Sequence, residues 1–74
     1  MLIKGDLIRI PAGTCVIKND PSHLSIIHKY KFTEEPELAI FISYEGGEDA
    51  KVFLNNDYWI VNHKQINYVR KNVS

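Results

Sequence analysis

The side chains best suited to metal binding or nucleophilic catalysis are one cysteine, Cys15, and three histidines. Metal sites built on so few ligands show close paired spacing such as C-x2-C or H-x3-H, and neither pattern occurs here. Cys15 lies within an apolar run that predicts a strand, where a buried and unreactive thiol is the usual state. We therefore expect no metal site and no cysteine nucleophile. The histidines are His23, His28 and His63.

Carboxylates gather where the sequence predicts turns, which is the ordinary place for solvated charge and gives little support to a paired acid–base site. Gly46 and Gly47 stand alone and precede no helix, unlike the glycines of a phosphate-binding loop. We therefore expect a non-catalytic protein without a cofactor. The carboxylates concerned are Glu34, Glu35, Glu45, Glu48 and Asp49.

Short apolar runs separated by turn residues predict the strands that must position any binding site. Residues 7–10 and 14–17 form two such runs, and residues 24–27 and 29–32 are interpreted either as strands or as parts of a long irregular loop. Residues 37–44 form the longest run, which is apolar on both faces and is therefore expected to be central. One face of this run should carry Leu38, Ile40, Ile42 and Tyr44.

Residues 50–54 and 58–61 predict a β-hairpin, because the asparagines between them tolerate positive φ. We prefer a two-residue loop at 55–56, which puts small and branched residues beneath the one tryptophan and leaves Lys51 outside. A three-residue loop would exchange the two faces. With the preferred loop, the core pairs are Val52–Trp59 and Ala50–Val61, and the outer pairs are Phe53–Tyr58 and Lys51–Ile60.

The order of these elements resembles an SH3-like barrel of five or six strands, with a long early loop, a central hairpin, one helical turn at 63–66 and a last strand at 68–70. The likeness is carried by GDLIRI at 5–10 and by YWIV at 58–61, followed by QI at 65–66 and YV at 68–69. The chain is similar to small SH3-like proteins of tailed phages and, more loosely, to SH3-like accessory subunits of photosystem I and ferredoxin–thioredoxin reductase.

This resemblance implies an all-β adaptor or docking protein. The length of the chain predicts a single domain over residues 1–74, with 71–74 as a frayed tail. Signalling SH3 domains that bind proline-rich peptides carry a paired-tyrosine motif in the early loop, whereas residues 14–32 contain only Tyr30. Proline-peptide recognition is therefore not expected. A likeness of fold alone assigns no function.

Aromatic side chains supply the binding chemistry, since they give large contact area at low entropic cost. One interpretation is that most of the eight aromatics fill a small barrel. We predict instead that the outer face of the hairpin binds a protein partner, as in a phage-encoded or accessory factor that docks on a larger cytosolic assembly. The predicted partner-binding residues are Phe53, Tyr58 and Ile60, with Lys51 and Tyr44 at the rim.

Two alternatives remain at the level of sequence. The first is a nucleic-acid-binding barrel, in which cations contact phosphates and rings stack on bases. The second is a non-catalytic subunit that shapes the cofactor access of an enzyme. The first alternative is disfavoured because three glutamates directly follow its basic and aromatic stretch at 29–32 and repel phosphate. The residues of the first alternative are Lys29, Tyr30, Lys31, Phe32, Arg70 and Lys71.

Composition sets the remaining bounds. Nine basic and nine acidic side chains cancel, which disfavours non-specific nucleic-acid binding, although the charge runs +3 over 1–33, −6 over 34–57 and +3 over 58–74. A single cysteine excludes an internal disulfide and favours a reducing compartment. Because no apolar run approaches the roughly 20 residues of a membrane span, we expect a cytoplasmic protein, in the host cytoplasm if it is phage-encoded.

Overall fold

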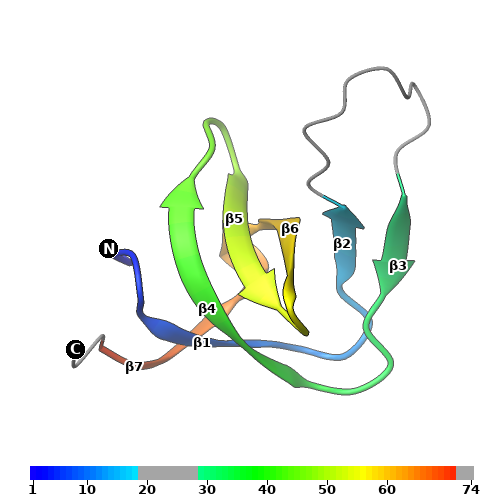
Figure 1. Ribbon diagram of the computed structural model, residues 1–74. Coiled ribbons are helices and arrows are strands. Elements are labelled where there is room, and N and C mark those ends of the chain that lie inside the picture. The colour runs from blue at the N-terminus through cyan, green and yellow to red at the C-terminus, as the bar shows by residue number, and fades with distance from the viewer. Residues whose placement is uncertain (19–28, 72–74) are drawn as a thin grey trace.

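The computed structural model describes residues 1–18 and 29–71, and these form seven strands in one antiparallel sheet (Figure 1). The predicted all-β class is confirmed. The sheet order is β3-β2-β6-β5-β4-β1-β7, so β3 and β7 are its edges and the sheet is not closed. The elements are β1 Leu7–Ile10, β2 Cys15–Lys18, β3 Tyr30–Phe32, β4 Glu37–Tyr44, β5 Asp49–Leu54, β6 Asp57–Asn62, the 3-10 turn η1 His63–Gln65, and β7 Asn67–Arg70.

The strand count differs from the predicted five or six. Residues 30–32, which the sequence left open between strand and loop, form β3 and pair with β2. The helical turn and the last strand lie where the sequence predicts them. The expected strand at 24–27 lies outside the described residues.

The register of the β5–β6 hairpin is the one that the two-residue loop predicts. Val52 pairs with Trp59 and Phe53 pairs with Tyr58. Asn55 and Asn56 adopt φ values of 52° and 64°, which match the right-handed twist of the flanking strands. The faces of the hairpin are therefore confirmed as predicted.

A bulge in β4 changes the face of one predicted residue. Phe41 pairs with Val52, but the register then shifts, so that Ser43 pairs with Lys51 and Tyr44 pairs with the buried Ala50. The extra residue shifts the pairing of the last residues of β4 by one position, so their side chains lie on the opposite face from the one that simple alternation predicts. The expectation that Tyr44 shares a face with Leu38 and Ile40 is therefore wrong.

The core lies on one face of the sheet. Figure 1 shows β4 bending along its length, with the β2–β3 hairpin standing to one side of β4, β5 and β6. Leu2, Trp59 and Ile66 are partly buried and pack against the core. The buried hydrophobic residues are Ile8, Ile10, Val16, Ala39, Phe41, Ala50, Val52, Leu54 and Val61.

Folding interleaves the acidic segment 34–57 with the basic segments on either side of it. Asp57 forms an ion pair with Lys18, and Glu48 forms one with Lys64. The charge segments of the sequence thus neutralise one another in part. Within residues 1–18 and 29–71, no helix has the length and apolar character that a membrane crossing requires.

Candidate partner-binding face

The outer face of the hairpin carries a compact group of side chains turned away from the core. The rings of Phe53 and Tyr58 lie 5.1 Å apart between centroids with a 60° angle between their planes. The ammonium group of Lys51 lies 4.9 Å from the centre of the Tyr58 ring, within the range of a cation–π contact. Ile60 pairs with Lys51 across the hairpin. Four of the five predicted partner-binding residues are therefore together.

Strand pairing extends this group across two further strands. Ile60 pairs with Ile17 of β2, and Ile17 pairs with Tyr30 of β3. Paired residues lie on the same face of a sheet, so Tyr30 lies in line with Ile17 and Ile60. Phe32 follows two residues after Tyr30, and the two rings pack edge to face with 6.1 Å between centroids. We call these residues the outer face: Ile17, Tyr30, Phe32, Lys51, Phe53, Tyr58 and Ile60.

Exposure distinguishes the outer face from an ordinary core strand. The exposed fractions are 64% for Tyr30, 59% for Phe32, 43% for Tyr58 and 39% for Ile17. Aromatic side chains have areas of 150–250 Å², so the three rings together present roughly 300 Å² to solvent, and Ile17 adds to this. This is the size of the largest apolar patch on a typical monomer, and such a patch is often functional. The outer face is thus suited to contact with a macromolecule.

Tyr44, the fifth predicted residue, lies elsewhere. Its ring packs on Phe41 with 4.8 Å between centroids and meets His63 edge to face at 5.4 Å. Its hydroxyl accepts a hydrogen bond from the backbone N–H of Leu2 at 3.0 Å. Tyr44, His63 and Leu2 line an open groove of about 500 Å³, together with Tyr68. The structure does not bring Tyr44 to the outer face.

The residues of the nucleic-acid alternative are not brought together. Arg70 and Lys71 lie at or beyond the end of β7, at the opposite edge of the sheet from β3. Within β3 the rings of Tyr30 and Phe32 lie on the outer face, whereas Lys31 lies on the other face, paired with the buried Val16. A strand of nucleic acid on β3 would therefore find its stacking rings and its cations on different sides.

Lys31 instead joins a cluster around Trp59 that the sequence did not predict. Its ammonium group lies 4.9 Å from the centre of the Trp59 ring, and that of Lys18 lies at 5.4 Å. Lys18 also forms its ion pair with Asp57. The indole Nε1 is buried, and no described residue accepts a hydrogen bond from it.

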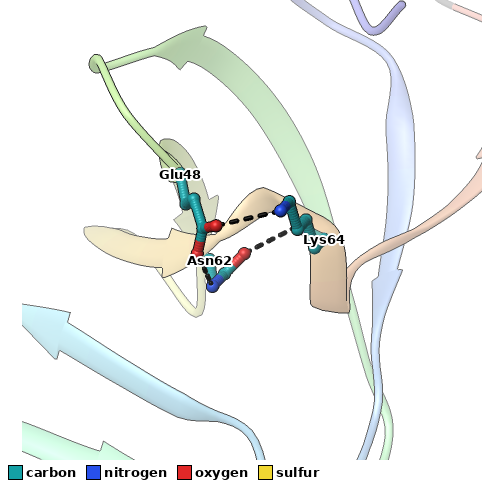
Figure 2. A network of polar contacts seen from close by, with 3 residues as sticks. All are labelled: Glu48, Asn62 and Lys64. Carbon is teal, nitrogen blue, oxygen red and sulfur yellow. Dashed lines mark hydrogen bonds and ion pairs between the residues drawn. The ribbon is translucent and has the colours of Figure 1, made fainter.

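A polar network lies at the end of β6, where Asn62 follows Ile60 by two residues and therefore lies on the same face. Figure 2 shows its three residues, Glu48, Asn62 and Lys64. Glu48 accepts hydrogen bonds from the ammonium group of Lys64 at 2.9 Å and from the amide of Asn62 at 3.0 Å. The Asn62 oxygen accepts from the backbone N–H of Lys64 at 2.8 Å and caps η1. The hydrogen bonds from Lys64 and Asn62 hold the pKa of the Glu48 carboxyl below its ordinary value.

Comparison with known proteins adds no relative. No protein-family model, curated protein or solved structure matches this chain. The assignment of function therefore rests on the geometry of the described residues.

The residues considered for metal or nucleophilic chemistry are dispersed. Cys15 is half-buried on β2, and His63 lies against Tyr44. His23 and His28 lie outside the described residues. In the part of the chain that the structure describes, no three His, Cys, Asp or Glu side chains gather as a metal site.

Proposed function

We propose that this chain is a non-catalytic protein–protein interaction module that docks through its outer face on a larger cytosolic assembly. The observation that carries the proposal is the exposed group of Tyr30, Tyr58 and Ile17 beside the half-buried Phe53 and Ile60. Aromatic side chains at the centre of an interface supply much of its affinity. Lys51 offers one cation within the group, which favours a partner carboxylate beside an apolar contact.

We further propose that the fold is an SH3-like barrel and that the protein is an accessory factor of the kind found in tailed phages. The order of the elements supports this: an early β2–β3 excursion, a central β5–β6 hairpin, one turn of 3-10 helix and a final strand beside β1. SH3-like accessory proteins are adaptors, so this fold agrees with a docking role. The other alternative is a non-catalytic subunit that shapes the cofactor access of an enzyme.

The test is a double variant, Phe53→Ser with Tyr58→Ser. Because Phe53 is half-buried, we expect the pair to cost about 1–2 kcal/mol of folding free energy and to leave the fold intact. Each ring contributes roughly 2 kcal/mol at the centre of an interface, so each loss should weaken binding about 30-fold. The measurement is quantitative mass spectrometry of proteins captured from the native cytosol, with circular dichroism as the check of folding.

The matched control is Tyr68→Ser with Val69→Ser, which removes two exposed apolar side chains from β7 at the other edge of the sheet. A partner captured by the parent and the control, but not by the hairpin variant, supports the proposal. A partner retained by a folded hairpin variant overturns it. Recovery of nucleic acid in place of protein would move the nucleic-acid alternative to first place.

A further inference from the structure

The edge strand β3 presents backbone groups that pair with no described residue. Among the described residues, β3 pairs with β2 alone. The carbonyl of Lys29 accepts a hydrogen bond from β2 at 2.7 Å, and the N–H of Thr33 donates one toward the start of β2 at 2.9 Å. Hydrogen-bonded pairs alternate along an antiparallel ladder, so Lys31 also faces β2. The N–H and C=O groups of Tyr30 and Phe32 therefore point to the open edge.

The side chains along this edge alternate in chemistry. Tyr30 and Phe32 are exposed on the outer face, while Lys29 and Lys31 are exposed on the opposite face. Within the described residues, neither lysine forms an ion pair, although the ammonium group of Lys31 lies over the Trp59 ring, on the side of β3 away from the open edge. An added strand would place its own side chains directly beside these, since cross-strand neighbours lie on the same face. Along residues 29–32, the edge is therefore complementary to a strand that alternates apolar and acidic residues, whereas Glu34 and Glu35 repel acidic residues beyond the end of β3.

The other edge of the sheet lacks these properties. The register of β7 against β1 shifts between Leu7 and Ile8, and a bulge of this kind disfavours the addition of a further strand. The pairing of β3 with β2 shows no such shift. A second copy of the chain adding to β3 would set Lys29 and Lys31 against the same lysines, which is unfavourable.

We propose that the open edge of β3 binds an extended segment of the partner protein, which adds to the sheet as a further strand and alternates apolar with acidic residues. This rests on the proposed docking function and names the chemistry of the partner. The apolar residues of the added strand lie beside Tyr30 and Phe32 and lengthen the outer face. Its acidic residues lie beside Lys29 and Lys31. Backbone hydrogen bonds supply affinity, and the alternating side chains supply specificity.

The test uses a capped synthetic peptide of about ten residues that alternates valine with glutamate, and a control peptide that alternates valine with lysine. Hydrogen exchange of the 15N-labelled protein is followed by NMR at single amides. We expect the glutamate peptide to slow exchange at Tyr30 and Phe32 at least tenfold. The amide of Lys31, which already faces β2, should not change. Unchanged exchange at Tyr30 and Phe32 with millimolar peptide, or equal protection by the lysine peptide, overturns the proposal.

Two variants separate the backbone contribution from that of the side chain. Tyr30→Pro removes an edge N–H without removing a bond to β2, and Tyr30→Thr removes the ring but keeps the N–H. We expect the proline variant to bind the glutamate peptide at least tenfold more weakly than the threonine variant. Equal binding by the two variants would contradict strand addition. The double reversal Lys29→Glu with Lys31→Glu should exchange the preference between the two peptides.

The outcomes distinguish this inference from the docking proposal. If the peptide protects the amides of Tyr30 and Phe32 while the partner still binds the Phe53 and Tyr58 variant, strand addition is supported and the hairpin face is excluded as the docking site. If the hairpin variant loses the partner but the peptide protects no amide of β3, docking through the hairpin face is supported and strand addition is excluded. A doubled mass in sedimentation, with Tyr30 and Phe32 protected in the absence of peptide, would identify a second copy as the occupant and overturn the proposal.

Discussion

Trp59 lies directly between Val52 of β5 and Lys18 of β2, paired with one on each side. Through Val52 it packs against the core, and through Lys18 and Lys31 it contacts the β2–β3 hairpin. The same side chain thus joins the central hairpin to the strands that extend the outer face.

Trp59→Ala should destabilise the fold. Because Trp59 is half-buried, we expect a loss of about 2–3 kcal/mol, at or below the lower end of the range for a fully buried tryptophan. For a chain of this length, the melting temperature should fall by roughly 10–20 °C. Thermal melting followed by circular dichroism measures this. Tyr68→Ala, at an exposed ring, is the control and should change stability by about 0.5 kcal/mol or less. A fall of only a few degrees for Trp59→Ala would contradict the packing described above.

The turn between β5 and β6 predicts opposite effects for two substitutions at one position. Asn56 has a φ of 64°. Asn56→Gly should leave stability unchanged or raise it by up to about 1 kcal/mol, because glycine adopts this conformation without strain. Asn56→Val should lower it by about 1–2 kcal/mol, because a β-branched side chain clashes there. Urea unfolding of both variants gives the comparison, and the reverse order of stability would contradict the two-residue turn.

The Glu48 network predicts a measurable response to acid. Since the folded pKa of Glu48 is lowered, the network stabilises the fold at pH values above the ordinary carboxyl range, and this contribution is lost as the pH falls through the folded pKa. Lys64→Met should move the pKa of Glu48 back toward its ordinary value, because Lys64 is the main cause of the shift. NMR titration of the side-chain carboxyl carbon measures it. Lys71→Met, at an exposed lysine outside the network, is the control. An unchanged pKa in Lys64→Met would exclude the ion pair in solution.

Binding to nucleic acid should be weak and sensitive to salt. The chain has no net charge, Lys18 is paired with Asp57, and Arg70 lies at the opposite sheet edge from β3. Few phosphates can then be neutralised at once, and affinity falls steeply with salt. Fluorescence titration with single- and double-stranded oligomers near 150 mM salt is the measurement. Submicromolar affinity at that salt concentration would displace the docking proposal.

Local sequence was sufficient to predict the central hairpin. The two-residue loop was preferred over a three-residue loop because it places small and branched residues beneath Trp59 and leaves Lys51 outside, and the structure has that register. The bulge in β4 was not predictable in this way. Residues 38–42 are a continuous run of apolar residues, and such a run carries no alternation that marks where one extra residue is inserted. Tyr44 was therefore placed on the wrong face.

The contribution of β3 to the candidate site was also beyond local reasoning. Tyr30 and Phe32 were grouped with Lys29 and Lys31 because they are adjacent in sequence, yet a strand sends alternate side chains to opposite faces. Their place in line with Ile60 of the central hairpin depends on the pairing of β2 with β6, between residues more than 40 positions apart. Local sequence patterns do not predict which distant strands pair.

Met1 and Lys71 both line the groove that contains Tyr44, so the first and last described residues share one side of the molecule. Figure 1 shows β3 on the other side, beyond the central strands. An affinity tag or a sensor-surface linkage at either end would therefore hold the protein with the β3 edge directed into solution. Attachment at either end should therefore give the same measured binding of a peptide to the β3 edge.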